Sequence, residues 1–278
     1  MSNDFYVFKL NLFMARKKNI ANIDEYELGY IEAKMRSQRE YNPNEYDDFQ
    51  LKKHLFKVDI KCKNKKQKEF LQMLKDPKNE ICFGIGSAGS GKSYLSLGFA
   101  LSQLKDPTTP YEKIIILVPT CEAGAMSLGF LKGTLLEKIG PYLEADSYTM
   151  EKILNNSGNV GSKTIINSLI GNGYINYEVV NFARGKTFDN SLILINEAEN
   201  YSKEEMLLLL TRVGEGSKLI ITGDLKQLDR KDIKKSKTDC GLEHATKQLQ
   251  DMDEVGLVEF HDEDIVRNPL ISKILENW

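Results

Sequence analysis

Short apolar runs alternate with longer amphipathic stretches along most of this 278-residue chain. Uninterrupted apolar runs of this length are typical of strands buried on both faces, and helical patterns separate most of them. We therefore predict an α/β fold in which a mainly parallel sheet carries helices on both faces. The predicted strands are Ile81–Ile85, Ile114–Val118, Tyr177–Phe182, Leu192–Ile195, Leu219–Thr222 and Val255–Phe260, and the predicted helices are Tyr94–Leu104, Thr134–Tyr142, Lys203–Val213 and Leu242–Met252.

The first 60 residues differ from the rest, because they are rich in Asn, Tyr, Glu and Lys and contain no clear apolar strand. A helix is expected over Glu25–Arg39, and Pro43 follows it closely. We interpret residues 1–60 as an N-terminal appendage and residues 61–278 as the main domain. Five lysines in Lys61–Lys68 form either a solvated helix face or a nucleic-acid contact.

Composition narrows the class of protein. Hydrophobic residues make up 41% of the chain, charged residues 28%, and the formal net charge is -2, which suits a globular protein without a strong overall bias toward nucleic acid. The longest apolar run, Ile114–Val118, is far below the roughly 18 residues of a membrane helix. The four cysteines have no Cys-x-x-Cys spacing and the three histidines are scattered, so we expect reduced thiols, no zinc site and a cytoplasmic location without membrane contact.

A phosphate-binding loop follows the first predicted strand directly. Residues Gly86-Ser87-Ala88-Gly89-Ser90-Gly91-Lys92-Ser93 match the pattern Gly-x-x-x-x-Gly-Lys-Ser, and a helical pattern begins at Lys92. Its glycines allow the backbone N–H groups to surround phosphate oxygens. Lys92 is expected to reach the β- and γ-phosphates and Ser93 to bind Mg²⁺. The motif predicts a nucleoside triphosphate site, with ATP as the expected ligand.

A second motif follows the strand Leu192–Ile195. Apolar residues followed by acidic ones form the Walker B pattern, in which an Asp orders Mg²⁺ and a following Glu polarises the attacking water. Here the first position is Asn196 and the second is Glu197. We expect Glu197 to be the general base, and Asn196 to hold the metal shell less strongly than a carboxylate.

A third polar segment ends the strand Leu219–Thr222. Asp224 and Gln227 lie in this segment, Gly223-Asp224-Leu225-Lys226-Gln227. A plain turn is one interpretation. Because the segment is the third strand end beside a nucleotide motif, we favour a sensor of the γ-phosphate or of its water.

Together these motifs resemble the PhoH family of ATPases, which is related to the motor domain of superfamily 1 helicases. The resemblance covers about residues 62–275 and follows the motifs in order. It rests on Gln67, on the segment Phe83–Leu95, on Glu122–Gly124 and Leu128–Gly133, on Arg184–Thr187, Leu210–Arg212 and Thr222–Asp224, and on Val266–Pro269.

The resemblance implies a RecA-like P-loop NTPase domain that uses ATP and Mg²⁺. It further implies that Gln67 reads adenine, with an exposed polar residue on a lysine-rich helix as the alternative, and that Tyr94 belongs to the nucleotide-binding segment. Arg184 would contact the nucleotide, or alternatively form a surface salt bridge. Arg267 would be an arginine finger, or alternatively a surface salt bridge. Members of the family are associated with RNA, so RNA or single-stranded nucleic acid is the expected partner. A single motor domain is expected to act as a homo-oligomer, for example a hexameric ring.

The chain departs from the family in its Walker B segment. The family pattern Asp-Glu-Ala-Gln-Asn is Asn196-Glu197-Ala198-Glu199-Asn200 here. Two functions stay open at this point. The first is an ATPase coupled to RNA or single-stranded nucleic acid, favoured by Glu197 and Arg267. The second is an ATP-binding switch or assembly factor with weak or no hydrolysis, favoured by Asn196.

Overall fold

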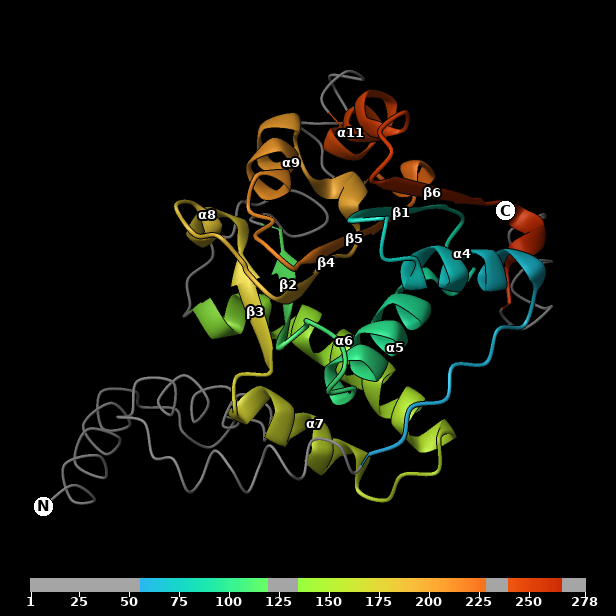
Figure 1. Ribbon diagram of the computed structural model, residues 1–278, viewed down its shortest axis with the longest axis vertical. Coiled ribbons are helices and arrows are strands. Elements are labelled where there is room, and N and C mark those ends of the chain that lie inside the picture. Colours follow the sequence, from blue (N-terminus) through green and yellow to red (C-terminus); the bar gives the residue numbers. More distant parts are fainter. Residues whose placement is uncertain (1–55, 120–134, 229–239, 267–278) are drawn as a thin grey trace, which may run out of the picture.

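A six-stranded parallel sheet forms the centre of the molecule, seen in a computed structural model that describes residues 56–119, 135–228 and 240–266 (Figure 1). The strand order is β3-β2-β4-β5-β1-β6, and every strand pair is parallel. The prediction of a mainly parallel α/β sheet is confirmed. The strands are β1 (Ile81–Gly86), β2 (Lys113–Val118), β3 (Ile175–Val179), β4 (Ser191–Ile195), β5 (Lys218–Gly223) and β6 (Val255–Phe260).

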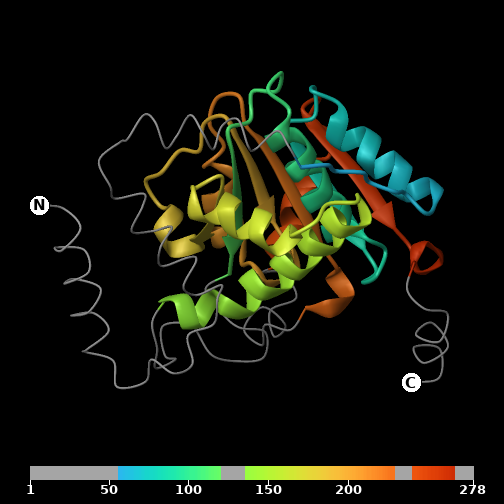
Figure 2. The same ribbon diagram turned by 90° about the horizontal axis from the view of Figure 1, so that it is seen from below.

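Helices cover both faces of this sheet (Figures 1 and 2). Alternate residues of each central strand face opposite sides, so Ile114 and Ile116 join one apolar cluster while Ile115 and Leu117 join the other. The first cluster lies under α4 (Lys65–Lys75), α5 (Lys92–Lys105), α6 (Leu135–Asn156) and α7 (Ser162–Gly171). The second lies under α8 (Val180–Ala183), α9 (Lys203–Leu210) and α11 (Gly241–Leu249).

The three predicted motifs end neighbouring strands. In the sheet, β5 lies between β4 and β1, and the phosphate-binding loop, the Asn196-Glu197 pair and Asp224 follow β1, β4 and β5 respectively. Because the carboxyl ends of parallel strands lie at one edge of a sheet, the fold brings these segments together. Three single-turn 3₁₀ helices lie at this edge: η2 (Ala198–Asn200), η3 (Leu225–Gln227) and η4 (Asp262–Asp264).

The predicted strand Tyr177–Phe182 is wrong at both ends. The strand is Ile175–Val179, and Val180–Ala183 forms the short helix α8. Strand β3 is at the edge of the sheet and pairs only with β2, whose last paired residue, Val118, lies opposite Val179. Beyond this point no described residue pairs with this backbone as a strand, and it forms a helical turn instead.

Helix boundaries also differ from the sequence predictions. The predicted helix Thr134–Tyr142 continues to Asn156, because Leu143, Met150, Ile153 and Leu154 carry the apolar pattern onward into the core. Helix α7 was not predicted, because glycines lie close to both of its ends and suggest turns. Helices α9 and α11 end earlier than predicted, at Leu210 and Leu249.

The segment just before the predicted domain boundary packs onto the sheet domain. Phe56 is buried in the first apolar cluster, Lys57 N donates to Asn159 Oδ1 (2.8 Å), and Asp59 N donates to Ser157 Oγ (2.8 Å). The predicted appendage, residues 1–60 with its helix Glu25–Arg39, otherwise lies outside the described residues. In the described part of the chain no helix is long and apolar enough to cross a membrane, and Cys62, Cys82 and Cys240 are unpaired thiols.

Candidate nucleotide-binding site

The phosphate-binding loop connects β1 to α5, as predicted. Gly86 has φ +127°, and a Cβ there would lie 1.8 Å from the backbone oxygen of Phe260 on the neighbouring strand β6. No other residue fits this close approach. Gly91 has φ +93° and is the N-cap of α5. The helix therefore begins at Lys92 with its N–H groups and its positive dipole end directed at the loop.

The side chain of Lys92 lies inside the loop. Its Nζ donates to Gly86 O (2.5 Å) and Ser87 O (2.9 Å), and Ser90 Oγ is 3.3 Å away. Ser90 is fully buried, and its hydroxyl donates to Ser87 O (2.8 Å). These contacts hold the ammonium group at the centre of the loop, where it can meet the oxygens of a bound phosphate.

Gln67 on α4 supports the loop from outside. Its Nε2 donates to Ser90 O (2.7 Å), its Oε1 accepts from Lys63 N (2.7 Å), and its side chain is buried. An exposed polar residue on a lysine-rich helix, the alternative to a functional role, does not describe this position. Tyr94, in contrast, is partly buried against the apolar cluster of that face.

Asp224 joins the loop to the end of β5. Its Oδ2 accepts from Ala88 N (3.0 Å), its Oδ1 accepts from Lys226 N (3.0 Å), and its own N–H donates to Glu199 Oε2 (3.0 Å). Gln227 is exposed in η3. A change at the loop can therefore reach Glu199, three residues after Asn196, through two hydrogen bonds.

Burial makes Glu199 a weaker acid than an exposed glutamate. The side chain is 4% exposed, and desolvation raises its pKa to about 7, although the hydrogen bond from the backbone of Asp224 opposes the shift. Glu197 and Asp224 add smaller repulsive contributions in the same direction as burial. The carboxyl group therefore keeps its proton to a higher pH than an ordinary glutamate does.

The end of β6 adds an acidic residue to the rim of the loop. Ser87 Oγ donates to Asp262, and Lys226 Nζ is 3.3 Å from the same carboxylate. These two contacts, the serine hydroxyl first, lower the pKa of Asp262. Val266 N donates to Gly89 O (3.1 Å), so the segment after β6 also touches the loop.

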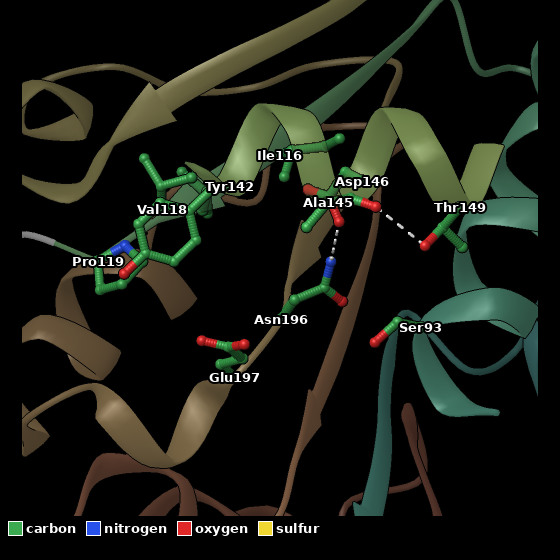
Figure 3. A pocket seen from close by; sticks show the side chains of 11 residues that line it. Ser93, Ile116, Val118, Pro119, Tyr142, Ala145, Asp146, Thr149, Asn196 and Glu197 are labelled. Atoms are coloured by element: carbon green, nitrogen blue, oxygen red, sulfur yellow. Dashed lines mark hydrogen bonds between the residues drawn. The ribbon is translucent and has the colours of Figure 1, made fainter. Parts of the chain in front are cut away.

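The Walker B segment faces a pocket at the end of β4 (Figure 3). Asn196 and Glu197 line this pocket together with Ser93 from the start of α5 and Asp146 from α6. Glu197 is exposed, and its backbone has φ +50°, which is uncommon outside glycine. The structure thus brings together the predicted base and both predicted metal-binding residues.

Asn196 makes two side-chain hydrogen bonds across this pocket. Its Nδ2 donates to Asp146 Oδ1 (3.3 Å), and its Oδ1 accepts from Thr222 Oγ1 (3.0 Å). Desolvation, followed by repulsion from Glu197, raises the pKa of Asp146 to about 7, and the bond from Asn196 opposes the shift. Asp146 therefore binds a proton more readily than an exposed aspartate does.

The oxygen groups around this pocket fit the expected Mg²⁺. Ser93 offers a hydroxyl, Asn196 an amide oxygen, and Asp146 and Glu197 offer carboxylates, which are the hard ligands that Mg²⁺ prefers. The described residues contain no group of three or more His, Cys, Asp and Glu side chains placed to hold a metal ion by themselves. Mg²⁺ normally binds with substrate phosphates through one or two protein groups, and this arrangement is compatible with that mode.

The structure does not bring Arg184 to the loop. Arg184 is exposed and follows α8, which itself follows strand β3. In the sheet, β3 lies four positions from β1, so the two strands are separated by on the order of 19 Å at the usual strand spacing. Arg267 lies outside the described residues, as do Glu122–Gly124 and Leu128–Gly133. The roles given to these segments by the resemblance stay predictions.

Sequence reasoning missed Asp146, Glu199 and Asp262 as parts of the site. Asp146 could have been found by continuing the helical pattern, because Tyr142, Ala145, Asp146 and Thr149 share one face of α6 and all line the pocket. Asp262 could have been found as the first acidic residue after the last strand. Nothing in the sequence alone indicates that Glu199 folds back onto Asp224.

Known proteins with similar sequences share one family description. The model of the family described as PhoH-like protein matches residues 59–278. A PhoH-like protein of Bacillus subtilis (strain 168) is 34% identical over 248 residues, which cover 89% of this chain and 72% of the relative. A PhoH-like protein of Mycobacterium tuberculosis (strain ATCC 25618 / H37Rv) is 36% identical over 219 residues, 79% of this chain and 58% of the relative.

Among solved structures, the Pif1 helicase from Candida albicans covers 78% of this chain and 44% of its own, at a TM-score of 0.37 and 14% identity. The family assignment depends on the sequence matches and agrees with the parallel sheet and the loop described above. This chain belongs to the PhoH family and has its P-loop NTPase domain.

Proposed function

We propose that this chain is an ATPase whose turnover is coupled to RNA or single-stranded nucleic acid. The observation that carries the proposal is the shared pocket of Ser93 and Glu197 beside an intact phosphate-binding loop. A residue for the metal and a residue for the water then lie on opposite walls of one site (Figure 3).

In this mechanism the loop N–H groups and Lys92 bind the β- and γ-phosphates, and Ser93 holds the metal side of the nucleotide. Glu197 orients a water molecule and accepts its proton as the water oxygen attacks the γ-phosphorus. The bond from the γ-phosphorus to the bridging oxygen breaks, and ADP leaves with that oxygen and its electron pair while inorganic phosphate is formed. Bound Mg²⁺ would neutralise charge on the phosphate oxygens. Asp224, bonded to Ala88 N, would report the state of the loop to Glu199.

Nucleic-acid coupling is supported by exposed groups at two places. Lys61, Lys63, Lys65 and Lys68 are exposed around the start of α4. Phe182 is 56% exposed beside the exposed Arg184, and an exposed aromatic ring next to a cation suits base stacking. Assembly into a homo-oligomer, which would let Arg267 face a neighbouring site, belongs to the same proposal.

Asn196 favours a second function, an ATP-binding switch with weak or no hydrolysis. An uncharged amide at this position binds Mg²⁺ less strongly than a carboxylate. The two functions share ATP binding and differ in turnover.

Turnover assays test the proposal. Phosphate release is measured with and without single-stranded RNA, at low and high salt, on the natural chain, Glu197→Gln and the exposed control Glu204→Gln. We expect RNA to stimulate release, salt to reduce the stimulation, and Glu197→Gln to lower turnover about 100-fold or more while ATP still binds. Tight ATP binding without turnover, with or without RNA, would instead establish the switch.

A further inference from the structure

Asp146 occupies a position that the motif pattern does not anticipate. It comes from α6, fifty residues before the Walker B segment, and lines the same pocket as Ser93, Asn196 and Glu197. Figure 3 shows its carboxylate next to the Asn196 amide, on the far side of Asn196 from Glu197. A carboxyl group therefore lies beside the amide that stands at the Walker B aspartate position.

The hydrogen bonds of Asn196 fix the direction of its amide. Its oxygen accepts from the Thr222 hydroxyl and its nitrogen donates to Asp146. A carboxylate at position 196 could accept from Thr222 but could not donate to Asp146. It would place two acidic groups in contact at about the 3.3 Å of the present bond, and one of them would then bind a proton. With an amide at position 196, residue 146 is the member of the pair that carries a carboxyl group.

We propose that Asp146 supplies the carboxylate for the magnesium ion of the bound nucleotide, in the place of an acid at position 196. Asn196 is its positioning residue, which orients the carboxylate by donating to Oδ1. The inference depends on the proposed triphosphate site and assigns the metal-side residue of that site. It also explains how one carboxylate can bind the metal ion although the Walker B segment has an asparagine at position 196.

A purely structural role for Asp146 makes a different prediction. If Asp146 only ties α6 to β4 through Asn196, its loss lowers stability and leaves metal binding unchanged. Asp146→Asn separates the two roles, because its amide oxygen can still accept from Asn196 while its charge is gone. Glu144→Gln is the matched control, since Glu144 lies on the same helix and is exposed.

The experiment measures Mn²⁺ affinity, from the electron paramagnetic resonance signal of free Mn²⁺, in the complex of the protein with a non-hydrolysable ATP analogue. We expect Asp146→Asn to weaken Mn²⁺ binding about tenfold or more, and Glu144→Gln to leave it unchanged. The exchanged pair Asp146→Asn/Asn196→Asp should recover most of the loss. Asn196→Asp alone should give no gain, because it brings two carboxylates together.

Nucleotide binding without metal, measured in EDTA, separates this inference from the proposed function. If the natural chain binds the analogue in EDTA but Asp146→Asn keeps full Mn²⁺ affinity, the assignment of Asp146 is wrong and the triphosphate site stands. The assignment is equally wrong if Asn196→Asp alone strengthens Mn²⁺ binding and the exchanged pair gives no recovery. If the natural chain binds no analogue under either condition, both proposals fail.

Discussion

Two walls of the nucleotide site are built in different ways. The phosphate wall, Gly86–Ser93, is one continuous segment whose contacts are mainly those of its backbone and of Lys92. The acidic wall consists of Asp146 from α6, the pair Asn196 and Glu197 that follows β4, and Thr222 of β5, whose hydroxyl donates to Asn196. A continuous backbone structure allows few substitutions. A wall of assembled side chains can keep its charge while moving it from one position to another, which is the arrangement we propose for Asn196 and Asp146.

The largest loss of stability is expected from a substitution where the phosphate wall meets the sheet. Gly86→Ala would place a Cβ 1.8 Å from Phe260 O at φ +127°, so β1 and β6 must separate. We expect a loss of more than about 3 kcal/mol in the free energy of unfolding, measured in urea, together with loss of ATP binding.

Gly158→Ala is the matched control for this change. Gly158 also has a positive φ, +80°, but a Cβ there meets nothing within 4 Å. We expect Gly158→Ala to lower the free energy of unfolding by about 1 kcal/mol, which is the cost of the positive φ alone. Equal losses for the two variants would show that close approach to β6 does not determine the shape of the phosphate wall.

A smaller change in stability is expected at Glu199. This residue accepts from Asp224 N, and Asp224 in turn accepts from Ala88 N of the phosphate wall. Its pKa is raised from the ordinary 4.5 to about 7, so the folded protein binds an extra proton between these pH values. Stability from this group is therefore complete below about pH 4.5 and falls as the pH rises through 7. Glu199→Gln keeps an acceptor for Asp224 N and removes the buried charge.

We expect Glu199→Gln to raise the free energy of unfolding by about 1–3 kcal/mol at pH 8 and to leave it nearly unchanged at pH 4.5. Urea denaturation at a series of pH values measures the difference. Some dependence on pH should persist in the variant, because the pKa of Asp146 is raised in the same direction. Glu204→Gln, an exposed change, should show no such pattern, and an equal gain at both pH values would contradict the assigned cause.

The same contrast explains what the sequence could predict. The phosphate wall is contiguous, so its pattern of glycines, Lys92 and Ser93 identifies it without any knowledge of the fold. The sheet could be predicted because its buried strands are continuous apolar runs. The helical pattern places Asp146 on one face of α6, but its contact with Asn196 could not be predicted, because that contact depends on where α6 crosses the end of β4. The edge strand β3 was misplaced for a related reason, since the end of its pairing with β2 is not visible in its own residues.

The smallest effect concerns Gln67, which supports the phosphate wall from α4. Gln67→Ala removes the donor to Ser90 O and the acceptor for Lys63 N. Such support acts on every nucleotide alike, so we expect the affinities for ATP and GTP to fall together, by about fivefold, or about 1 kcal/mol. Titration calorimetry with both nucleotides measures this, and Gln72→Ala, an exposed change on the same helix, should have no effect. If Gln67 instead reads adenine, the affinity for ATP will fall more than that for GTP, and α4 will then belong to the base-binding part of the site rather than to the support of the phosphate wall.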